Sequence, residues 1–345
     1  MQVKLKRNSS IELLRILCMI FIIMHHIIIT TIAPNFSSPL YNFLDTIFHT
    51  AVVIFVIISG YFGIKFRFIK FLNLWGQVLY YSIILGFIAY FILNSISLKS
   101  FISSAFPIYT RPYWFVSSYI ELYLFAPILN IVVKGATRLQ LLISIFLLFV
   151  FNWAFPIDLI SSTGLSLFSM LYFLGRYIYI YKRDSYKSNK IIITNLILYI
   201  ILLLPLCYVL PAESRYFNIF LSFTYRYYSL GIIYSSLLIF LIFRNKNFTN
   251  NIINYISSSV FAIYLIHENP YVSRYMYIKP VQFFSSLGIP SLLSMLIVTV
   301  LLFSFCILID QIRILLFRIL KPLFNRVIVL LTEYIKNLLS RLNLI

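Results

Sequence analysis

The sequence predicts an all-α, polytopic membrane protein with about ten transmembrane helices. Of its 345 residues, 61% are hydrophobic and 11% are charged, whereas a soluble protein has about 45–50% apolar and about 25% charged residues. The mean hydropathy is +0.95, and apolar runs long enough to cross a bilayer follow one another with short polar breaks. This composition excludes a soluble globular domain, a disordered chain and a disulfide-framed secreted module, because only lipid or other helices can surround such runs.

Apolar runs between polar breaks define the expected spans. They cover residues 11–32, 44–64, 72–94, 113–133, 139–156, 165–181, 191–210, 217–243, 252–269 and 289–311. Basic and apolar residues alternate in the remaining segment, 312–345, which predicts a basic amphipathic helix on the cytoplasmic membrane surface. An eleventh span over 319–339 is a weaker interpretation, because charged side chains interrupt it at Lys321, Arg326, Glu333 and Lys336.

The basic residues predict the orientation of these spans. The chain has 28 Lys and Arg residues against nine acids, a net charge of +19. With both termini in the cytoplasm, twenty of the 28 fall in inner segments and five in outer loops, as the positive-inside rule requires. We therefore interpret this charge as determining topology in a plasma membrane, and we expect membrane lipids and no nucleic acid as partners.

The first expected span holds the most informative ionisable residues, because such groups are costly within a bilayer unless they are paired or face a cavity. Arg15 and His26 are eleven residues apart, so a helix places them within about 20° of one face and about 16–17 Å apart along its axis. Glu12 lies one turn from Arg15 and can hold it, while His25 points about 100° away. In the alternative interpretation, Arg15 extends to the cytoplasmic surface and His26 is a hydrogen-bonded packing residue.

The second expected span ends in two small residues and is followed by a basic cluster. Ser59 and Gly60 permit the close approach of another helix. Lys65, Arg67 and Lys70 are either ordinary topology charges or an anion site for a phosphate-bearing ligand.

Two later spans carry further polar candidates. The fourth opens with Tyr113 and Trp114 and contains Glu121, a carboxylate that needs a partner within the membrane. The ninth ends with His267 and Glu268, which either line a substrate entrance or cap a helix that ends at the following proline.

Taken together, these segments resemble the acyltransferase 3 family of integral membrane acyltransferases. The matching pieces run in the family's order from about residue 8 to 311, which we take as the transmembrane domain. They are Arg7–Arg15 leading into His25-His26, Phe55–Phe62, Tyr113–Val116 and Tyr264–His267. The family's Arg-x10-His pattern falls on Arg15 and His26. The segment from Tyr264 to Pro270 is similar to the branch found in capsule and exopolysaccharide clusters of Gram-positive bacteria.

The resemblance implies a bacterial O-acyltransferase, with acetyl as the expected group and no metal. Acetyl-CoA would be the donor, and its phosphates would meet the basic inner surface. His26 would act as general base on a glycan hydroxyl or carry a transient acyl group. Glu121 or the His267–Glu268 pair would orient the imidazole or the acceptor. The remaining implied roles are phosphate binding by Arg15, Lys65, Arg67 and Lys70, and substrate binding by His267, Glu268, Tyr113 and Trp114.

The expected acceptor is a cell-surface or lipid-linked polysaccharide, with polysaccharide biosynthesis machinery as an expected partner. One departure from the family pattern concerns the basic residues after the second span. They are spread over Lys65, Arg67 and Lys70, where the family has a compact arginine-rich motif. The competing hypotheses are a lipid-linked oligosaccharide transporter, a polysaccharide polymerase and a non-catalytic membrane sensor. A transporter or a polymerase does not need a deep histidine eleven residues after an arginine at the cytoplasmic entrance.

Overall fold

A computed structural model of the chain describes residues 7–32, 38–107, 113–155, 164–181, 188–210 and 214–341, with the side chains of 217, 218 and 320–341 left aside. Within these ranges the regular structure is entirely helical, as predicted. The helices are α1 (Ser9–Ile27), α2 (Pro39–Phe48), α3 (Thr50–Phe62), α4 (Phe68–Phe87), α5 (Leu98–Ser103), α6 (Trp114–Gly135), α7 (Arg138–Ala154), α8 (Leu165–Tyr181), α9 (Asn189–Val209), α10 (Arg215–Thr224), α11 (Leu230–Arg244), α12 (Asn251–Ser257), α13 (Val260–His267), α14 (Lys279–Ser286) and α15 (Ser291–Arg341), and π-helical turns at Ile28–Ile32, Ile88–Ile92 and Arg274–Ile278.

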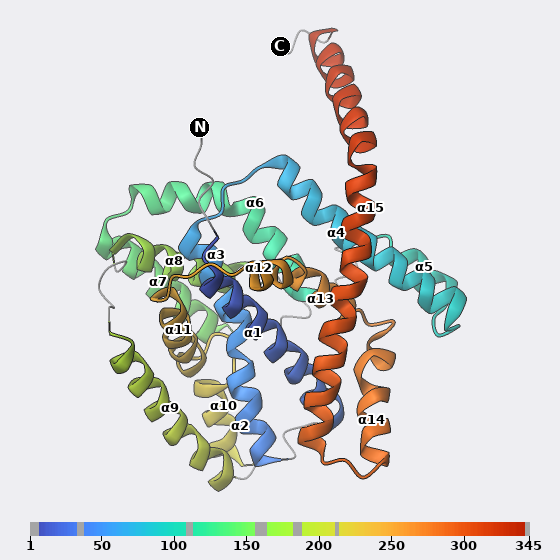
Figure 1. Ribbon diagram of the computed structural model, residues 1–345. Coiled ribbons are helices and arrows are strands. Elements are labelled where there is room, and N and C mark those ends of the chain that lie inside the picture. The colour runs from blue at the N-terminus through green and yellow to red at the C-terminus, as the bar shows by residue number, and fades with distance from the viewer. Residues whose placement is uncertain are drawn as a thin grey trace.

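Helix α1 runs through the middle of the bundle (Figure 1). Its first turn is fixed by Asn8, whose side-chain oxygen accepts a hydrogen bond from the backbone N–H of Ser10 at 3.0 Å, so a donor left open at the helix start is satisfied. The helix packs against α2, α3, α11, α12, α13 and α15. Its side chains therefore contact protein on several sides, which is the setting in which ionisable residues are tolerated at membrane depth.

The small residues of α3 allow it to lie very close to α8. A Cβ added at Gly60 would lie 2.4 Å from the carbonyl oxygen of Tyr172, and one added at Gly175 would lie 2.5 Å from that of Ile57. Only glycine fits this crossing, because either Cβ would overlap the backbone of the other helix. Of the two small residues expected to pack against another helix, Ser59 and Gly60, the close approach is confirmed at Gly60.

Six helical segments are long and apolar enough to cross a membrane among the described residues. They agree with the first, second, third, fourth, seventh and tenth expected spans and cover Ser9–Ile32, Pro39–Phe62, Phe68–Ile92, Trp114–Gly135, Asn189–Val209 and Ser291–Ile319. Helices α7 and α8 have 17 residues each, about one turn short of a full crossing. The count of ten spans and the membrane sides of the termini stay predictions.

Three expected spans are interrupted rather than continuous: the run 44–64 at His49 alone, between α2 and α3, and two others over longer segments. The run 217–243 divides into α10 and α11 around the non-helical residues 225–229, and the run 252–269 divides into α12 and α13 around Ser258 and Ser259. Non-helical backbone at membrane depth requires protein or a water-filled cavity around it. Both of these longer interruptions therefore indicate positions surrounded by other helices. Tyr227 in the first and Ser258 in the second each line one of the two cavities described in the next section.

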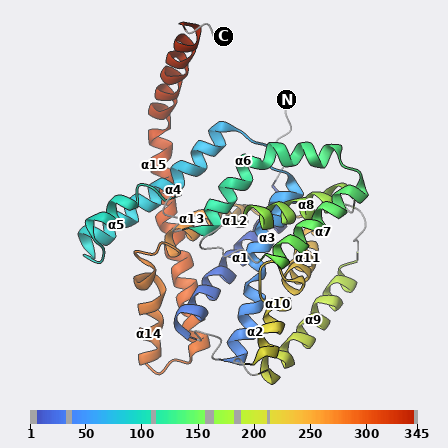
Figure 2. The same cartoon turned by 180° about the vertical axis from the view of Figure 1, so that it is seen from behind.

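The last span and the tail form one helix. Helix α15 has 51 residues and continues without a break past residue 311, where we expected the transmembrane domain to end. Both views show its C-terminal half extending beyond the other helices, on the side of the bundle where α1 begins (Figures 1 and 2). Residues 312–341 of the tail are thus helical, while residues 342–345 lie outside the described part of the chain and the position of the tail on a membrane surface stays a prediction.

Candidate active site

A cavity of about 280 Å³ lies beside α1. Arg15, Met19 and Ile22 line one wall, and these are the residues of the helix face that joins Arg15 to His26. The predicted face is therefore turned toward an internal space. The rest of the wall comes from several other elements, with Arg7, Glu12, Phe55, Ser59, Leu74, Phe115, Tyr119, Ser257, Ser258, Val260, Phe261 and Tyr264. We call this space the donor cavity, after the acyl donor that the sequence analysis expects.

The end of the donor cavity near the start of α1 is basic. The guanidinium of Arg15 lies 3.7 Å from the Glu12 carboxylate, and 38% of its side chain is exposed. This confirms the expected contact between the two residues. Arg7, which begins the first segment that resembles the family, also lines the cavity, although we had not predicted it as a site residue. The structure thus places two arginines where an anionic group entering the cavity would meet them.

The basic cluster after the second span lies outside this cavity wall. Lys65, Arg67 and Lys70 are all exposed, and none of the three belongs to the lining of the donor cavity. Lys70 is one helical turn before Leu74, which does line the cavity, so both lie on one face of α4. Phosphate binding by these three residues stays a prediction.

At the other end of this helix face, His26 contacts two residues from the end of α13. Its Nδ1 atom lies 2.8 Å from Oε2 of Glu268 and 3.2 Å from Nε2 of His267. The Nδ1 atom of His267 lies 2.7 Å from the carbonyl oxygen of Ile263 and donates its proton there, because a carbonyl can only accept. Neutral His267 then offers Nε2 as an acceptor. His26 therefore carries its proton on Nδ1, and its Nε2 holds a free lone pair.

Tyr113 fixes the end of α13 that carries these two residues. Its hydroxyl donates to the carbonyl oxygen of Leu265 at 3.1 Å and accepts from Nδ2 of Asn269 at 2.8 Å. The side chain is buried, and it belongs to neither cavity described in this section. The structure thus gives Tyr113 a positioning contact, whereas substrate binding by Tyr113 stays a prediction.

A second, much smaller cavity contains His26. Its volume of about 20 Å³ holds about one water-sized group. Its wall includes all three histidines of the first two spans and the predicted Trp114, and comprises Ile22, His25, His26, Phe48, His49, Val52, Trp114, Phe115, Tyr227 and Tyr264. Ile22, Phe115 and Tyr264 line both cavities, so these three side chains separate the donor cavity from the histidines. We call this space the histidine cavity.

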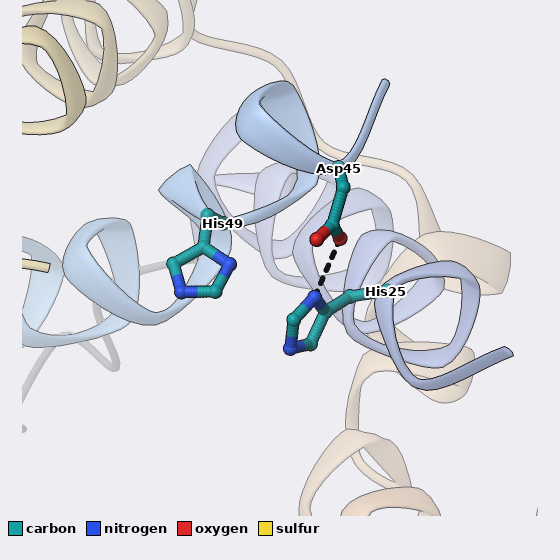
Figure 3. A group of neighbouring side chains, drawn as sticks. All are labelled: His25, Asp45 and His49. Atoms are coloured by element: carbon teal, nitrogen blue, oxygen red, sulfur yellow. Dashed lines mark hydrogen bonds and ion pairs between the residues drawn. The ribbon is translucent and has the colours of Figure 1, made fainter. Parts of the chain in front are cut away.

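A buried carboxylate next to the histidine cavity was missed in the sequence analysis. Oδ1 of Asp45 lies 2.6 Å from Nδ1 of His25, and Oδ2 accepts a hydrogen bond from the Tyr225 hydroxyl at 2.6 Å. Figure 3 shows Asp45 and His25 in contact, with His49 beside them. The available signal was an acid inside an expected span, which is costly without a partner.

Two groups of side chains have the donor atoms that a metal ion would need. They are His25, Asp45 and His49, and His26, His267 and Glu268, and within each group the ligand atoms lie within 4.8 Å of one another. Imidazole and carboxylate donors suit zinc. Both oxygens of Asp45, however, already lie at hydrogen-bonding distance from His25 and Tyr225. In this first group the geometry present is therefore that of a hydrogen-bonded imidazole–carboxylate pair, and in the second group the Glu268 carboxylate lies 2.8 Å from His26.

Glu121 is the predicted catalytic residue that lines neither cavity. It is half-buried on α6, two positions beyond Tyr119. Residues two apart on a helix face different directions. A catalytic role for Glu121 stays a prediction, and Glu268 occupies the place beside the imidazole.

The comparison with protein families agrees with this geometry. The family model described as an acyltransferase domain, acyltransferase 3, matches residues 8–310, almost the limits of the expected domain. Searches of curated proteins and of solved structures found no match. The match covers most of the chain, including the arginine and histidine of α1, the α3–α8 crossing and the end of α13. This multi-pass membrane protein therefore belongs to the acyltransferase 3 family, whose members are membrane acyltransferases.

Proposed function

We propose that the protein is an O-acyltransferase that moves an acetyl group from cytoplasmic acetyl-CoA to a hydroxyl of a cell-surface or lipid-linked polysaccharide. The observation that carries this proposal is the donor cavity, which follows the Arg15–Met19–Ile22 face of α1 toward His26. A helix places Arg15 and His26 about 16–17 Å apart, a separation comparable to the length of a pantetheine arm. A cation at one end and an imidazole near the other suit a donor with phosphates at one end and a thioester at the other.

Arg15 and Arg7 would bind the phosphates of the donor. Guanidinium groups form charge-assisted, bidentate hydrogen bonds with phosphate, and the Glu12 contact restricts the orientation of Arg15. The uncharged pantetheine arm then passes along Met19 and Ile22, both of which line the cavity. The thioester would approach His26 once the Ile22, Phe115 and Tyr264 side chains move apart.

His26 is suited to the chemical step because its two ring nitrogens have different tasks. Nδ1 is held by Glu268 and His267, which leaves Nε2 as the base or nucleophile. The Glu268 carboxylate also stabilises the positive charge that His26 acquires when Nε2 reacts. This division of roles is the one that an acid–histidine pair has in acyl-transfer enzymes.

The test uses purified protein in lipid nanodiscs with acetyl-CoA, and a thiol reagent that detects released CoA. We expect slow release of CoA from the wild-type protein and at least a ~100-fold slower release from His26→Gln, with an unchanged elution profile in size-exclusion chromatography. An oligosaccharide transporter or polymerase would release no CoA. Analysis of surface polysaccharide from a deletion strain by mass spectrometry should then show the loss of one acetyl group per modified repeat, and unchanged acetylation would exclude a polysaccharide acceptor.

A further inference from the structure

We propose that His25, positioned by Asp45, is a second base, which acts on the acceptor hydroxyl while His26 carries the acetyl group. This inference rests on the proposed function and deepens it. It divides the reaction into a donor step at His26 and an acceptor step at His25. Two adjacent residues of α1 would then serve the two halves of one transfer.

Each of the two neighbouring histidines has its own carboxylate. His26 Nδ1 lies 2.8 Å from Glu268 at the end of α13, and His25 Nδ1 lies 2.6 Å from Asp45 in α2. The Asp45 side chain is only 2% exposed, and its second oxygen accepts from the Tyr225 hydroxyl at 2.6 Å. A carboxylate held in this way fixes the tautomer of His25 with the proton on Nδ1 and the lone pair on Nε2.

The two imidazoles line the same small space. His25 and His26 both belong to the wall of the histidine cavity, and their ring centroids are 5.1 Å apart. The cavity holds about one water-sized group, which is the size of the hydroxyl that must react. A group placed there lies within reach of both rings, and the donor cavity is on the other side of Ile22, Phe115 and Tyr264.

A third histidine adds a polar wall to this space. The Nδ1 atom of His49 is buried and makes no hydrogen bond to any residue in the described part of the chain. The His49 ring stands edge-on to His25, with centroids 4.6 Å apart, and stacks on Tyr227 at 4.2 Å. Tyr225 and Tyr227 belong to the non-helical segment between α10 and α11. Non-helical backbone at this depth is tolerated where it is buried in protein or lines a polar cavity, and Tyr227 and His49 both line the histidine cavity, where the unpaired His49 nitrogen could contact a polar group.

Direct transfer needs only one base, whereas two steps make use of both. In the first step, Nε2 of His26 attacks the thioester carbonyl carbon. A C–N bond forms, the C–S bond breaks, and CoA leaves as the thiolate. The acetyl-imidazolium of His26 keeps its Nδ1 proton beside Glu268. In the second step, Nε2 of His25 takes the proton of the acceptor hydroxyl, the new C–O bond forms, and the C–N bond to His26 breaks. The proton on His25 then passes through solvent to the CoA thiolate.

The experiment measures the two steps separately in the purified protein. Exchange of radiolabelled CoA into acetyl-CoA reports the donor step alone, since it requires a covalent acetyl-enzyme. Hydrolysis of acetyl-CoA reports both steps, with water as the smallest hydroxyl. We expect His25→Gln to lower hydrolysis by about 100-fold while exchange changes by less than about threefold. His26→Gln should abolish both reactions. Asp45→Asn should lower hydrolysis relative to exchange in the same direction, because Asp45 acts through His25.

Asp310→Asn is a matched control for Asp45→Asn. Asp310 is also a buried carboxylate that accepts from a tyrosine hydroxyl, that of Tyr81 at 2.7 Å, and it contacts a nitrogen of Arg313 at 2.6 Å. The Asp310→Asn substitution should leave the ratio of hydrolysis to exchange at the wild-type value even if it lowers thermal stability. Parallel loss of both reactions in His25→Gln and Asp45→Asn, or normal hydrolysis in both, would overturn the second base. CoA release without exchange in the wild type would overturn the acetyl-His26 step and leave the proposed function standing, whereas the absence of any acetyl-CoA turnover would contradict the proposed function itself.

Discussion

Replacing Glu268 by glutamine tests how much the carboxylate beside His26 contributes to the reaction. The substitution keeps the shape of the side chain and removes its charge. At 2.8 Å, two unit charges attract by about 6 kcal/mol at an effective dielectric constant of about 20. Because 22% of the Glu268 side chain is exposed, solvent screening reduces this value, and we take about half of it, about 3 kcal/mol. Since about 1.36 kcal/mol corresponds to a tenfold change in rate, Glu268→Gln should lower kcat by about 100-fold.

The assay is CoA release at several acetyl-CoA concentrations, which separates kcat from KM. Glu12→Gln is the matched control, because it is the same chemical change at the other end of the donor cavity, where Glu12 contacts Arg15. We expect Glu12→Gln to change the KM for acetyl-CoA with little effect on kcat, and Glu268→Gln to do the reverse. A Glu268→Gln protein with normal kcat and a raised KM would show that Glu268 binds substrate and does not assist His26.

Three further substitutions test the donor cavity and the helix packing. Arg15→Ala should raise the KM for acetyl-CoA by about tenfold or more, because a charge-assisted contact is lost. The control Arg138→Ala removes a guanidinium that donates to Tyr177 and should leave this KM unchanged. Equal KM values for the two variants, measured from initial rates, would refute phosphate binding by Arg15. Ile22→Trp should fill the partition between the two cavities and lower kcat/KM for acetyl-CoA by about 10-fold or more, and an unchanged value would place the donor path elsewhere. Gly175→Ala should destabilise the protein by about 1–3 kcal/mol, because the added Cβ would lie 2.5 Å from the carbonyl oxygen of Ile57. In the control Gly76→Ala the added Cβ has nothing within 4 Å, so the melting temperature should not fall. Similar melting curves for the two variants would contradict the close α3–α8 crossing.

The sequence predicted the face of α1 because that face depends only on helical periodicity. Arg15, Met19 and Ile22 are brought together by 3.6 residues per turn, and the structure places all three on one cavity wall. The contact between His26 and Glu268 depends instead on how α13 packs against α1. His26 and Glu268 were both predicted site residues. Glu268 directly follows His267, which is 241 positions from His26 in the sequence. Sequence spacing carries no information on a contact of that kind.

Asp45 and the helix interruption at 225–229 show a second kind of feature that the sequence alone does not predict. The run 217–243 has no proline or glycine at the point where the helix breaks, so its composition predicts one continuous span. The break becomes understandable only from its surroundings, where Tyr225 donates to Asp45 and Tyr227 stacks on His49. Such tertiary contacts compensate for the lost helical hydrogen bonds. Local preference and the folded structure disagree here, and disagreements of this kind are expected at functional sites.

The distribution of charge along α1 accounts for the direction in which a CoA thioester would enter. Arg7 and Arg15 lie at one end of the donor cavity, and the carboxylates of Asp45 and Glu268 lie beside the histidines at the far end of the same helix. A donor with anionic phosphates is therefore attracted at the first end and repelled at the second, while its uncharged thioester experiences neither force. In the proposed mechanism, the same carboxylates would stabilise the imidazolium that either histidine forms during the reaction. The acids would thus keep the phosphates away from the histidines and lower the energy of the charged intermediate, which explains why a chain with only nine acids places two of them there.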